Sequence, residues 1–151
     1  MKLVIAAKTA NRLQQKWAED YLKSTPWRDS IVLFYNREDI PDLLASSDIF
    51  VYATPHNSND SLPRALLEAQ SAGLPVVTTD TTGCPEIVSD GMTGFVVPYE
   101  TEAMAEKIVQ LIDSPQLRRE LGRAAQQRIA QTFNWDQMAD QYAKVFLEIA
   151  G

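Results

Sequence analysis

The amino-acid sequence predicts an α/β fold: a doubly wound parallel sheet followed by a helical carboxyl-terminal tail. Three observations lead to this prediction. Short apolar runs recur through the first 98 residues, helical patterns separate them, and the last third of the chain reads as helix throughout. Alternating strands and helices indicate right-handed crossovers between parallel strands. We therefore expect a single domain, with a sheet core in residues 1–98 and the tail in residues 99–151.

The predicted strands are short apolar runs. They read KLVIAA, SIVLFY, DIFVYA, PVVTT and GFVV, at residues 2–7, 30–35, 48–53, 75–79 and 94–97. Their apolar residues are consecutive rather than alternating with polar ones, as expected of parallel strands that are buried on both faces. The runs therefore predict a sheet that helices cover.

Helical patterns fill the segments between these runs. In NRLQQKWAEDYLK, which begins at Asn11, the spacing places Leu13, Trp17 and Tyr21 on one stripe. DIPDLLASS predicts a shorter helix, and the stretch DSLPRALLEAQSAGLPVV predicts a helix that ends at Gly73 before the fourth strand.

The tail helices have recognisable start signals. Thr101 is placed to cap EAMAEKIVQLI, and Ser114 before Pro115 has the pattern of an N-cap followed by proline at the first helical position. Asn134 and Gln137 have capping-box spacing ahead of the last helix. These helices are predicted to serve packing rather than chemistry.

Composition argues against several classes of protein. The 151 residues are 45% hydrophobic, and the net charge of −6 comes without a basic stripe, which argues against a nucleic-acid partner. Cys84 is the only cysteine and His56 the only histidine, so neither an intrachain disulfide nor a Cys/His metal cluster is expected. Neither a membrane-length apolar run nor a signal peptide is evident, and a cytoplasmic location is the simple expectation.

Ligands of open α/β sheets bind beyond the carboxyl ends of the strands. That rule selects four loops, at residues 8–11, 36–38, 54–63 and 80–86. Two acids, Asp60 and Glu68, lie in or just after the third of these loops, and they have two interpretations.

The structural interpretation needs no ligand. Asp60 or Ser61 would accept hydrogen bonds from the first amides of the helix, where an acid also suits the helix dipole. Arg64 and Glu68 are four residues apart and could form a surface pair that contributes about 0.2–0.5 kcal/mol.

The functional interpretation uses the spacing of the two acids. Eight residues of helix separate them by about 12 Å along the axis and by about 80° around it. Free amides at a helix N-terminus bind phosphate, and carboxylates accept hydrogen bonds from vicinal hydroxyls. Asp60 and Glu68 would then lie on either side of the diphosphate of a nucleotide sugar.

The longest informative segment is EDIPDLLASSDIFVYATPHNSNDSLPRALLEAQSAGLPVVTTDTTGCPEIVSDGMTGFVVP. It resembles the carboxyl-terminal, donor-binding domain of family 4 retaining glycosyltransferases with the GT-B fold. The resemblance covers nearly the whole chain, including NWDQMADQY in the tail, and is most specific between Asp39 and Pro98. It implies that the sheet is Rossmann-like and forms one half of a GT-B fold.

The resemblance assigns roles to residues of the third loop and its helix. Glu68 matches the family glutamate that holds the ribose hydroxyls, and Asp60 stands where the family has another glutamate, which faces the transferred sugar. Ser61 and Leu62 would offer backbone amides to phosphate or sugar, and Arg64 is the obvious local cation.

Three further residues are weaker matches to the donor site. Asn36 and Arg37 follow the second strand at the position where family members receive the nucleotide base, with a solvated loop as the equal alternative. His56 would lie near the sugar or, as the more ordinary interpretation, on a surface loop.

The TTGCPE loop departs from the family pattern in one position. It keeps Gly83, Pro85 and Glu86 of the family loop but has Thr82 in place of a glycine. Cys84 is interpreted as a loop residue and not as a nucleophile.

Parts of the family pattern have no counterpart. Family members begin this domain with an additional strand and a loop whose arginine and lysine hold the diphosphate, and they carry an amino-terminal acceptor domain. The KLVIAAK segment corresponds to the second strand of the domain. The sequence is therefore interpreted as a fragment that is inactive alone, with an exposed sheet edge that a homodimer could cover.

The predicted reaction is transfer of a sugar from a UDP- or GDP-linked donor to an acceptor, with retention and without metal or cofactor, in bacterial polysaccharide or glycoconjugate synthesis. The complete enzyme would be cytoplasmic or lie at the membrane surface. Two alternatives remain: a non-catalytic nucleotide-binding or interaction module, and a sugar-nucleotide epimerase of GT-B architecture. The epimerase would release free nucleotide without an acceptor.

Overall fold

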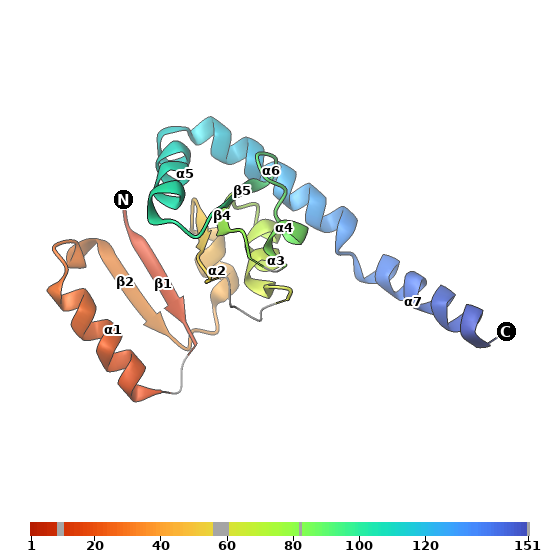
Figure 1. The fold of residues 1–151 in the computed structure, drawn as a ribbon, viewed down its shortest axis with the longest axis horizontal. Coiled ribbons are helices and arrows are strands. Elements are labelled where there is room, and N and C mark those ends of the chain that lie inside the picture. The colour runs from red at the N-terminus through yellow and green to blue at the C-terminus, as the bar shows by residue number, and fades with distance from the viewer. Residues whose placement is uncertain (9–10, 56–60, 82, 151) are drawn as a thin grey trace. The chain divides into compact units, whose positions relative to one another are not determined.

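The computed structural model describes residues 1–8, 11–55, 61–81 and 83–150. The chain divides into two compact units, the amino-terminal unit Met1–Ile40 and the carboxyl-terminal unit Pro41–Gly151. Figure 1 shows the elements of both.

The amino-terminal unit is a two-stranded parallel sheet with one helix. Its elements are β1 (Leu3–Ala7), α1 (Arg12–Ser24), the short helix η1 (Arg28–Ser30) and β2 (Ile31–Tyr35). The two strands pair in register from Leu3 opposite Ile31 to Ala7 opposite Tyr35. Helix α1 begins where the Asn11 side chain accepts from the amide of Leu13 at 2.9 Å.

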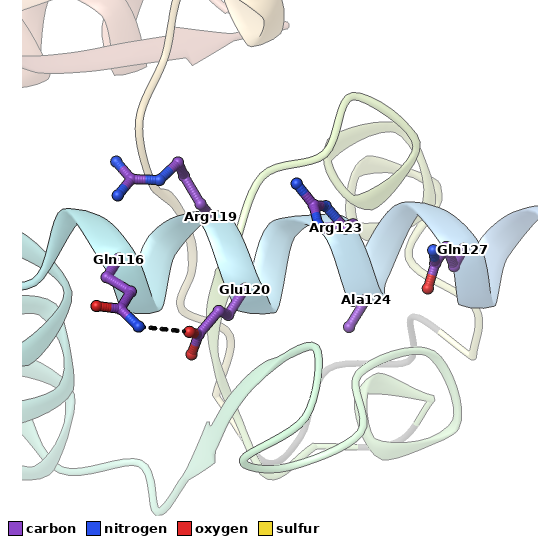
Figure 2. A pocket seen from close by; sticks show the side chains of 6 residues that line it. All are labelled: Gln116, Arg119, Glu120, Arg123, Ala124 and Gln127. Atoms are coloured by element: carbon purple, nitrogen blue, oxygen red, sulfur yellow. Dashed lines mark hydrogen bonds between the residues drawn. The ribbon is translucent and has the colours of Figure 1, made fainter.

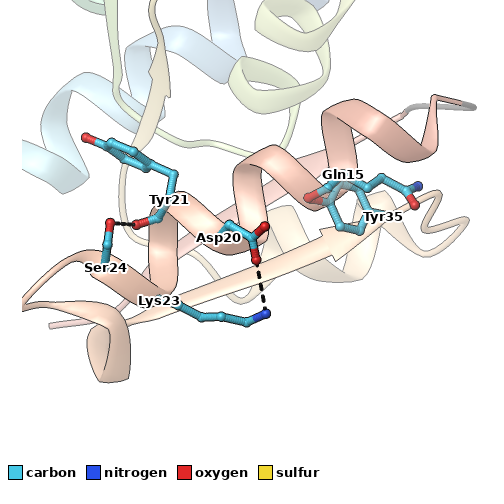
Figure 3. A network of polar contacts seen from close by, with 6 residues as sticks. All are labelled: Gln15, Asp20, Tyr21, Lys23, Ser24 and Tyr35. Carbon is cyan, nitrogen blue, oxygen red and sulfur yellow. Dashed lines mark hydrogen bonds and ion pairs between the residues drawn. The ribbon is translucent and has the colours of Figure 1, made fainter.

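Helix α1 packs through a different face from its aromatic stripe. The Tyr35 hydroxyl donates to the carbonyl of Gln15 at 3.2 Å and so ties α1 to β2 (Figure 3). The predicted stripe is present but faces solvent: Trp17 is 69% exposed, and its ring stacks on that of Tyr21 with 5.6 Å between centroids. Ala18 on the other side of the helix is partly buried instead.

The carboxyl-terminal unit contains a three-stranded parallel sheet and most of the helices. Its strands are β3 (Phe50–Tyr52), β4 (Val76–Thr79) and β5 (Gly94–Val97), in the order β3-β4-β5. Its helices are α2 (Ile40–Ala45), which begins at the unit boundary, α3 (Arg64–Ser71), α4 (Cys84–Ile87), α5 (Thr101–Asp113), α6 (Pro115–Thr132) and α7 (Trp135–Ala150).

The core of this unit lies between β4, β5 and the tail helices α5 and α6. Its buried members are Val77, Val97, Leu111 and Leu121. Strand β4, which reads VVTT, is buried along its whole length, as expected of a parallel strand covered on both faces. The same expectation is wrong for β1, where Leu3 and Val4 are exposed.

Helices α3 and α6 meet at two glycines. Helix α3 ends in a Schellman motif, in which the amides of Gly73 and Leu74 donate to carbonyls of the last helical turn and Gly73 has φ +78°. Gly122 of α6 approaches so closely that a Cβ built on it would lie 2.0 Å from the Gly73 carbonyl oxygen. Gln126 donates to the carbonyl of Ser71 at 3.0 Å beside this contact.

The start signals of the tail helices agree with the structure in two of three cases. Ser114 caps α6 by accepting from the amide of Leu117 at 3.2 Å, and the Asn134 side chain accepts from the amide of Asp136 at 2.8 Å. The expected cap at Thr101 is wrong. Thr101 is the first helical residue of α5, and the N-cap is Glu100, without a side-chain cap hydrogen bond.

The predicted α/β class with parallel, Rossmann-like strand–helix alternation is confirmed, and all five predicted strands are present within three residues of their expected ends. The strands form two parallel sheets instead of one continuous sheet: β1 with β2, and β3 with β4 and β5. Across the described residues, no helix is both long enough and apolar enough to cross a bilayer.

Candidate functional site

The predicted site residues belong to both units. Asn36 and Arg37 follow β2 in the amino-terminal unit, whereas the donor-loop residues belong to the carboxyl-terminal unit: Ser61, Leu62, Arg64 and Glu68. Two predicted residues, Asp60 and His56, lie outside the described residues. The candidate site in the carboxyl-terminal unit lies at the ends of β3 and β4 and at the start of α3.

A set of hydroxyl groups joins the carboxyl ends of β3 and β4. The amide of Thr54 donates to Thr79 Oγ1 at 3.1 Å, and the Thr79 hydroxyl donates back to the Thr54 carbonyl at 2.9 Å. Thr54 Oγ1 lies 2.8 Å from Thr81 Oγ1, which lies 3.2 Å from Cys84 Sγ. These contacts hold the two loops at a fixed separation.

Gly83, in the loop after β4, lies against the segment that precedes α3. Its φ of +83° is left-handed, and a Cβ built on it would lie 2.1 Å from the carbonyl oxygen of Ser61 and 3.2 Å from the amide nitrogen of Leu62. Only glycine permits this approach at this φ. The structure thus places the backbone of the loop after β4 directly against that of Ser61 and Leu62, two of the predicted site residues.

Helix α3 begins later than the sequence predicts, so residues 61–63 precede it and are not part of the helix. The helix begins at Arg64, and its N-cap is Pro63, which makes no side-chain cap hydrogen bond, so Ser61 is not the N-cap. Arg64 and Glu68 are both exposed, and the ion pairs among the described residues do not include these two. The surface pair of the structural interpretation is not formed.

Asn36 and Arg37 occupy a tight turn after β2. Asn36 has φ +51°, and its amide donates to the carbonyl of Ala7 at 2.9 Å. The Arg37 guanidinium makes a two-pronged ion pair with Asp39, with Nε 2.6 Å from Oδ1, and its carbon lies 4.7 Å from the centre of the Phe34 ring. Its polar contacts are thus satisfied within this turn.

The Arg37–Asp39 pair predicts a pH response. The hydrogen bond from Arg37 lowers the pKa of Asp39, and the same bond raises the pKa of Arg37. Because the pKa of Asp39 is depressed in the folded chain, the stabilisation is present above the ordinary aspartate pKa and is lost as the pH falls through the folded value. A ¹³C NMR titration of Asp39 should give a midpoint below the ordinary range, and Arg37→Gln should raise it. An unchanged midpoint in this variant contradicts the assignment.

Two features of the site were not anticipated from the sequence. Arg128 of α6 donates to the carbonyls of Glu86 at 3.0 Å and Ile87 at 3.3 Å, which fixes α4 to α6. The threonine contacts are the other feature. The sequence does carry a signal for these contacts, because Thr79 ends β4 and Thr54 follows β3 closely. Cys84 is fully buried, as a structural cysteine would be, but it is the first residue of α4 and not a loop residue.

A polar surface concavity lies elsewhere in this unit (Figure 2). It is lined by six residues of α6: Gln116, Arg119, Glu120, Arg123, Ala124 and Gln127. Gln116 donates to Glu120 at 2.8 Å across one turn. A concavity lined by one helix face has no converging polar groups from other elements, so we do not regard it as the functional site.

Comparisons with known proteins agree on one group. The model of the family described as "Glycosyl transferases group 1" matches residues 1–128. The chain is 30% identical over 119 residues to "Spore coat protein SA" of Bacillus subtilis, covering 78% of this chain and 31% of that protein. It is 30% identical over 137 residues to "Capsular polysaccharide biosynthesis glycosyltransferase CapM" of Staphylococcus aureus, covering 87% and 35%.

Solved structures give the same fold at lower identity. Anabaena Alr3699/HepE, whose crystal structure is in complex with UDP, superposes with a TM-score of 0.84 at 23% identity, over 98% of this chain and 41% of that one. Sucrose-phosphate synthase from Thermosynechococcus elongatus has a TM-score of 0.84 at 19% identity, over 98% and 38%. The chain spans about a third of the length of the curated relatives it matches.

Proposed function

Because the chain belongs to the group 1 glycosyl transferase family, we propose that it forms the donor-binding part of a retaining glycosyltransferase. The donor is a nucleotide sugar, and the product belongs to polysaccharide or glycoconjugate synthesis. The complexes of HepE with UDP and UDP-glucose support a nucleotide-sugar donor. The name of the relative CapM supports a role in polysaccharide synthesis. The single observation that carries the proposal is the family match over residues 1–128. The contact of Gly83 with the Ser61–Leu62 backbone supports a site at the carboxyl ends of β3 and β4.

The described residues supply three kinds of group to a donor. The amides of Ser61 and Leu62, with the open N-terminus of α3, suit the diphosphate, because helix amides bind phosphate and the helix dipole favours negative charge. Arg64 is an exposed cation in the first turn, outside the ion pairs of the described residues. Glu68 is an exposed carboxylate one turn further on and suits the ribose hydroxyls.

The proposed reaction exchanges one bond at the anomeric carbon. The bond from this carbon to the diphosphate oxygen breaks, and a bond to the acceptor oxygen forms on the same face. The acceptor proton passes to the departing diphosphate. The resemblance to the family implies that the step needs no metal ion. Electrostatic stabilisation of the leaving diphosphate is the main task of the protein in such a step. Asp60 would orient the sugar, and His56 would lie near the sugar.

The complete enzyme is proposed to contain more than this chain. From the resemblance, an acceptor domain and a basic phosphate loop would join this part, and the chain alone would bind donor weakly or not turn it over. A strand beside β1, or a second copy of the chain, would cover the sheet edge. We place the complete enzyme in the cytoplasm or at the membrane surface.

Calorimetric titration with UDP, GDP, ADP and their glucose conjugates tests the donor site. We expect one nucleotide to bind selectively. Glu68→Ala should weaken binding roughly 10- to 100-fold, because a hydrogen bond to a charged group contributes about 1.5–3 kcal/mol. Glu68 makes no ion pair among the described residues, so the variant should unfold at the same temperature as the wild type.

Glu102→Ala is the matched control for this experiment. Glu102 is an exposed acid in the first turn of α5, so its removal changes the net charge equally and should leave binding unchanged. Failure of every nucleotide to bind, or equal binding by wild type and Glu68→Ala, would sink the proposed donor site.

A further inference from the structure

The two loops of the proposed donor site are joined by buried side chains. Thr79 and Cys84 are almost completely inaccessible to solvent, and Thr81 is only 6% exposed. Buried polar groups stabilise the fold only when each has a hydrogen-bond partner. Removing one member of a connected set leaves its partners without a hydrogen bond. The contacts between Thr54, Thr79, Thr81 and Cys84 form one connected set, which we call the threonine lock.

Two arrangements of the hydroxyl hydrogens make the 2.8 Å contact between Thr54 and Thr81 a hydrogen bond. Thr79 gives its single hydroxyl proton to the Thr54 carbonyl, so its oxygen can only accept from Thr54. Thr54 then gives its own hydroxyl proton either to Thr79 or to Thr81. In the first case Thr81 donates to Thr54, and in the second Thr81 is free to donate to Cys84 Sγ. Thr81 is the link to the turn at Cys84 in both arrangements.

Thr81 also begins the turn that carries Gly83. Its carbonyl accepts from the amide of Cys84 at 3.0 Å, so Thr81 is bonded to Cys84 through its backbone as well as through its hydroxyl. Gly83 lies inside the turn and touches the backbone of Ser61 and Leu62. A displacement of Thr81 and Cys84 would therefore reach these two amides through the close contact of Gly83 with the Ser61–Leu62 backbone.

We infer that Thr81 is a positioning residue for the nucleotide-sugar donor: its hydroxyl fixes the Gly83 turn and thereby sets the place of the Ser61 and Leu62 amides. The inference rests on the proposed donor site. Thr81 itself need not touch the donor, because its hydroxyl contacts are Thr54 and Cys84.

The first test uses the ligand-free chain. Thr81→Val keeps the branched shape and removes the hydroxyl, whereas Thr81→Ser keeps the hydroxyl. In NMR spectra, Thr81→Val should lower the hydrogen-exchange protection of the Thr54 and Cys84 amides and shift the Ser61 and Leu62 amide resonances. Thr81→Ser should leave these resonances close to their wild-type positions.

The second test measures binding of the nucleotide that the wild type selects. Thr81→Val should raise the dissociation constant about tenfold, and Thr81→Ser should restore wild-type affinity. The matched control is Thr93→Val. Thr93 is also a buried threonine, and it accepts from Gln70 and from the amide of Ser89, but it precedes β5 at the opposite end of the sheet. It should lower the melting temperature without changing the dissociation constant.

The outcomes separate this inference from the proposed function. Unmoved Ser61 and Leu62 resonances in Thr81→Val overturn the inference, whether or not a nucleotide binds. Equal loss of affinity in Thr81→Val and Thr93→Val also overturns it, because the effect is then general destabilisation. Shifted Ser61 and Leu62 resonances in a chain that binds no nucleotide support the coupling and contradict the donor site.

Discussion

Replacing Gly83 with alanine is expected to lower the free energy of unfolding by more than about 2 kcal/mol and to remove nucleotide binding. The residue has φ +83°, which alone costs a non-glycine residue about 1–2 kcal/mol. The added Cβ would also lie 2.1 Å from the carbonyl oxygen of Ser61, a backbone atom that no side-chain rotation can move. Either the turn or the Ser61–Leu62 segment must therefore shift. Urea denaturation and calorimetric titration measure the two effects.

Gly91→Ala is the control that separates the cost of the left-handed backbone from the cost of the contact with Ser61. Gly91 has a similar φ of +69°, but a Cβ built on it would meet nothing within 4 Å. This variant should show the conformational cost alone, about 1–2 kcal/mol, and should bind nucleotide as the wild type does. Equal costs for the two variants would show that the contact between Gly83 and Ser61 has no energetic weight.

Gly122→Ala is expected to destabilise the chain by roughly 1–3 kcal/mol, which is opposite in sign to helix propensity. Alanine is favoured over glycine inside a helix by about 1 kcal/mol, and Gly122 lies within α6. However, its Cβ would lie 2.0 Å from the Gly73 carbonyl oxygen, so α6 would have to move away from the end of α3. Urea denaturation followed by circular dichroism measures the change.

Arg123→Ala is the control on the same helix. Arg123 is exposed and should change the free energy of unfolding by less than about 0.5 kcal/mol, as most surface substitutions do. A Gly122→Ala variant as stable as the wild type, or more stable, would show that α3 and α6 can separate without cost.

Local sequence patterns predicted the elements well where interactions between neighbouring residues determine them. The five apolar runs became five strands, and Ser114 before Pro115 and Asn134 marked helix starts correctly. The start of α3 was harder, because Asp60 and Ser61 are good caps in isolation. The chain instead enters the helix through Pro63 in an extended conformation, with ψ 101°.

Long-range pairing explains most of what the sequence did not predict. The contacts of Thr54 with Thr79 and Thr81 join residues 25 and 27 positions apart, and nothing in either segment alone identifies its partner. The helical spacing of Trp17 and Tyr21 predicted a stripe correctly but not the side of α1 that meets β2. The division of the strands into two sheets is also a long-range property, because it depends on which strands pair with one another. The predicted roles of Asp60 and Glu68 stay predictions.

The close approach of Gly83 to Ser61 restricts substitutions at position 83 much more than substitutions at position 61. The atom that excludes a side chain at position 83 is a carbonyl oxygen, which every residue type at position 61 would carry. No second substitution at position 61 can therefore rescue a change at position 83, whereas position 61 is exposed and can vary while Gly83 is kept. A library that randomises this loop to alter donor preference should hold residue 83 constant and diversify residues 61 and 62.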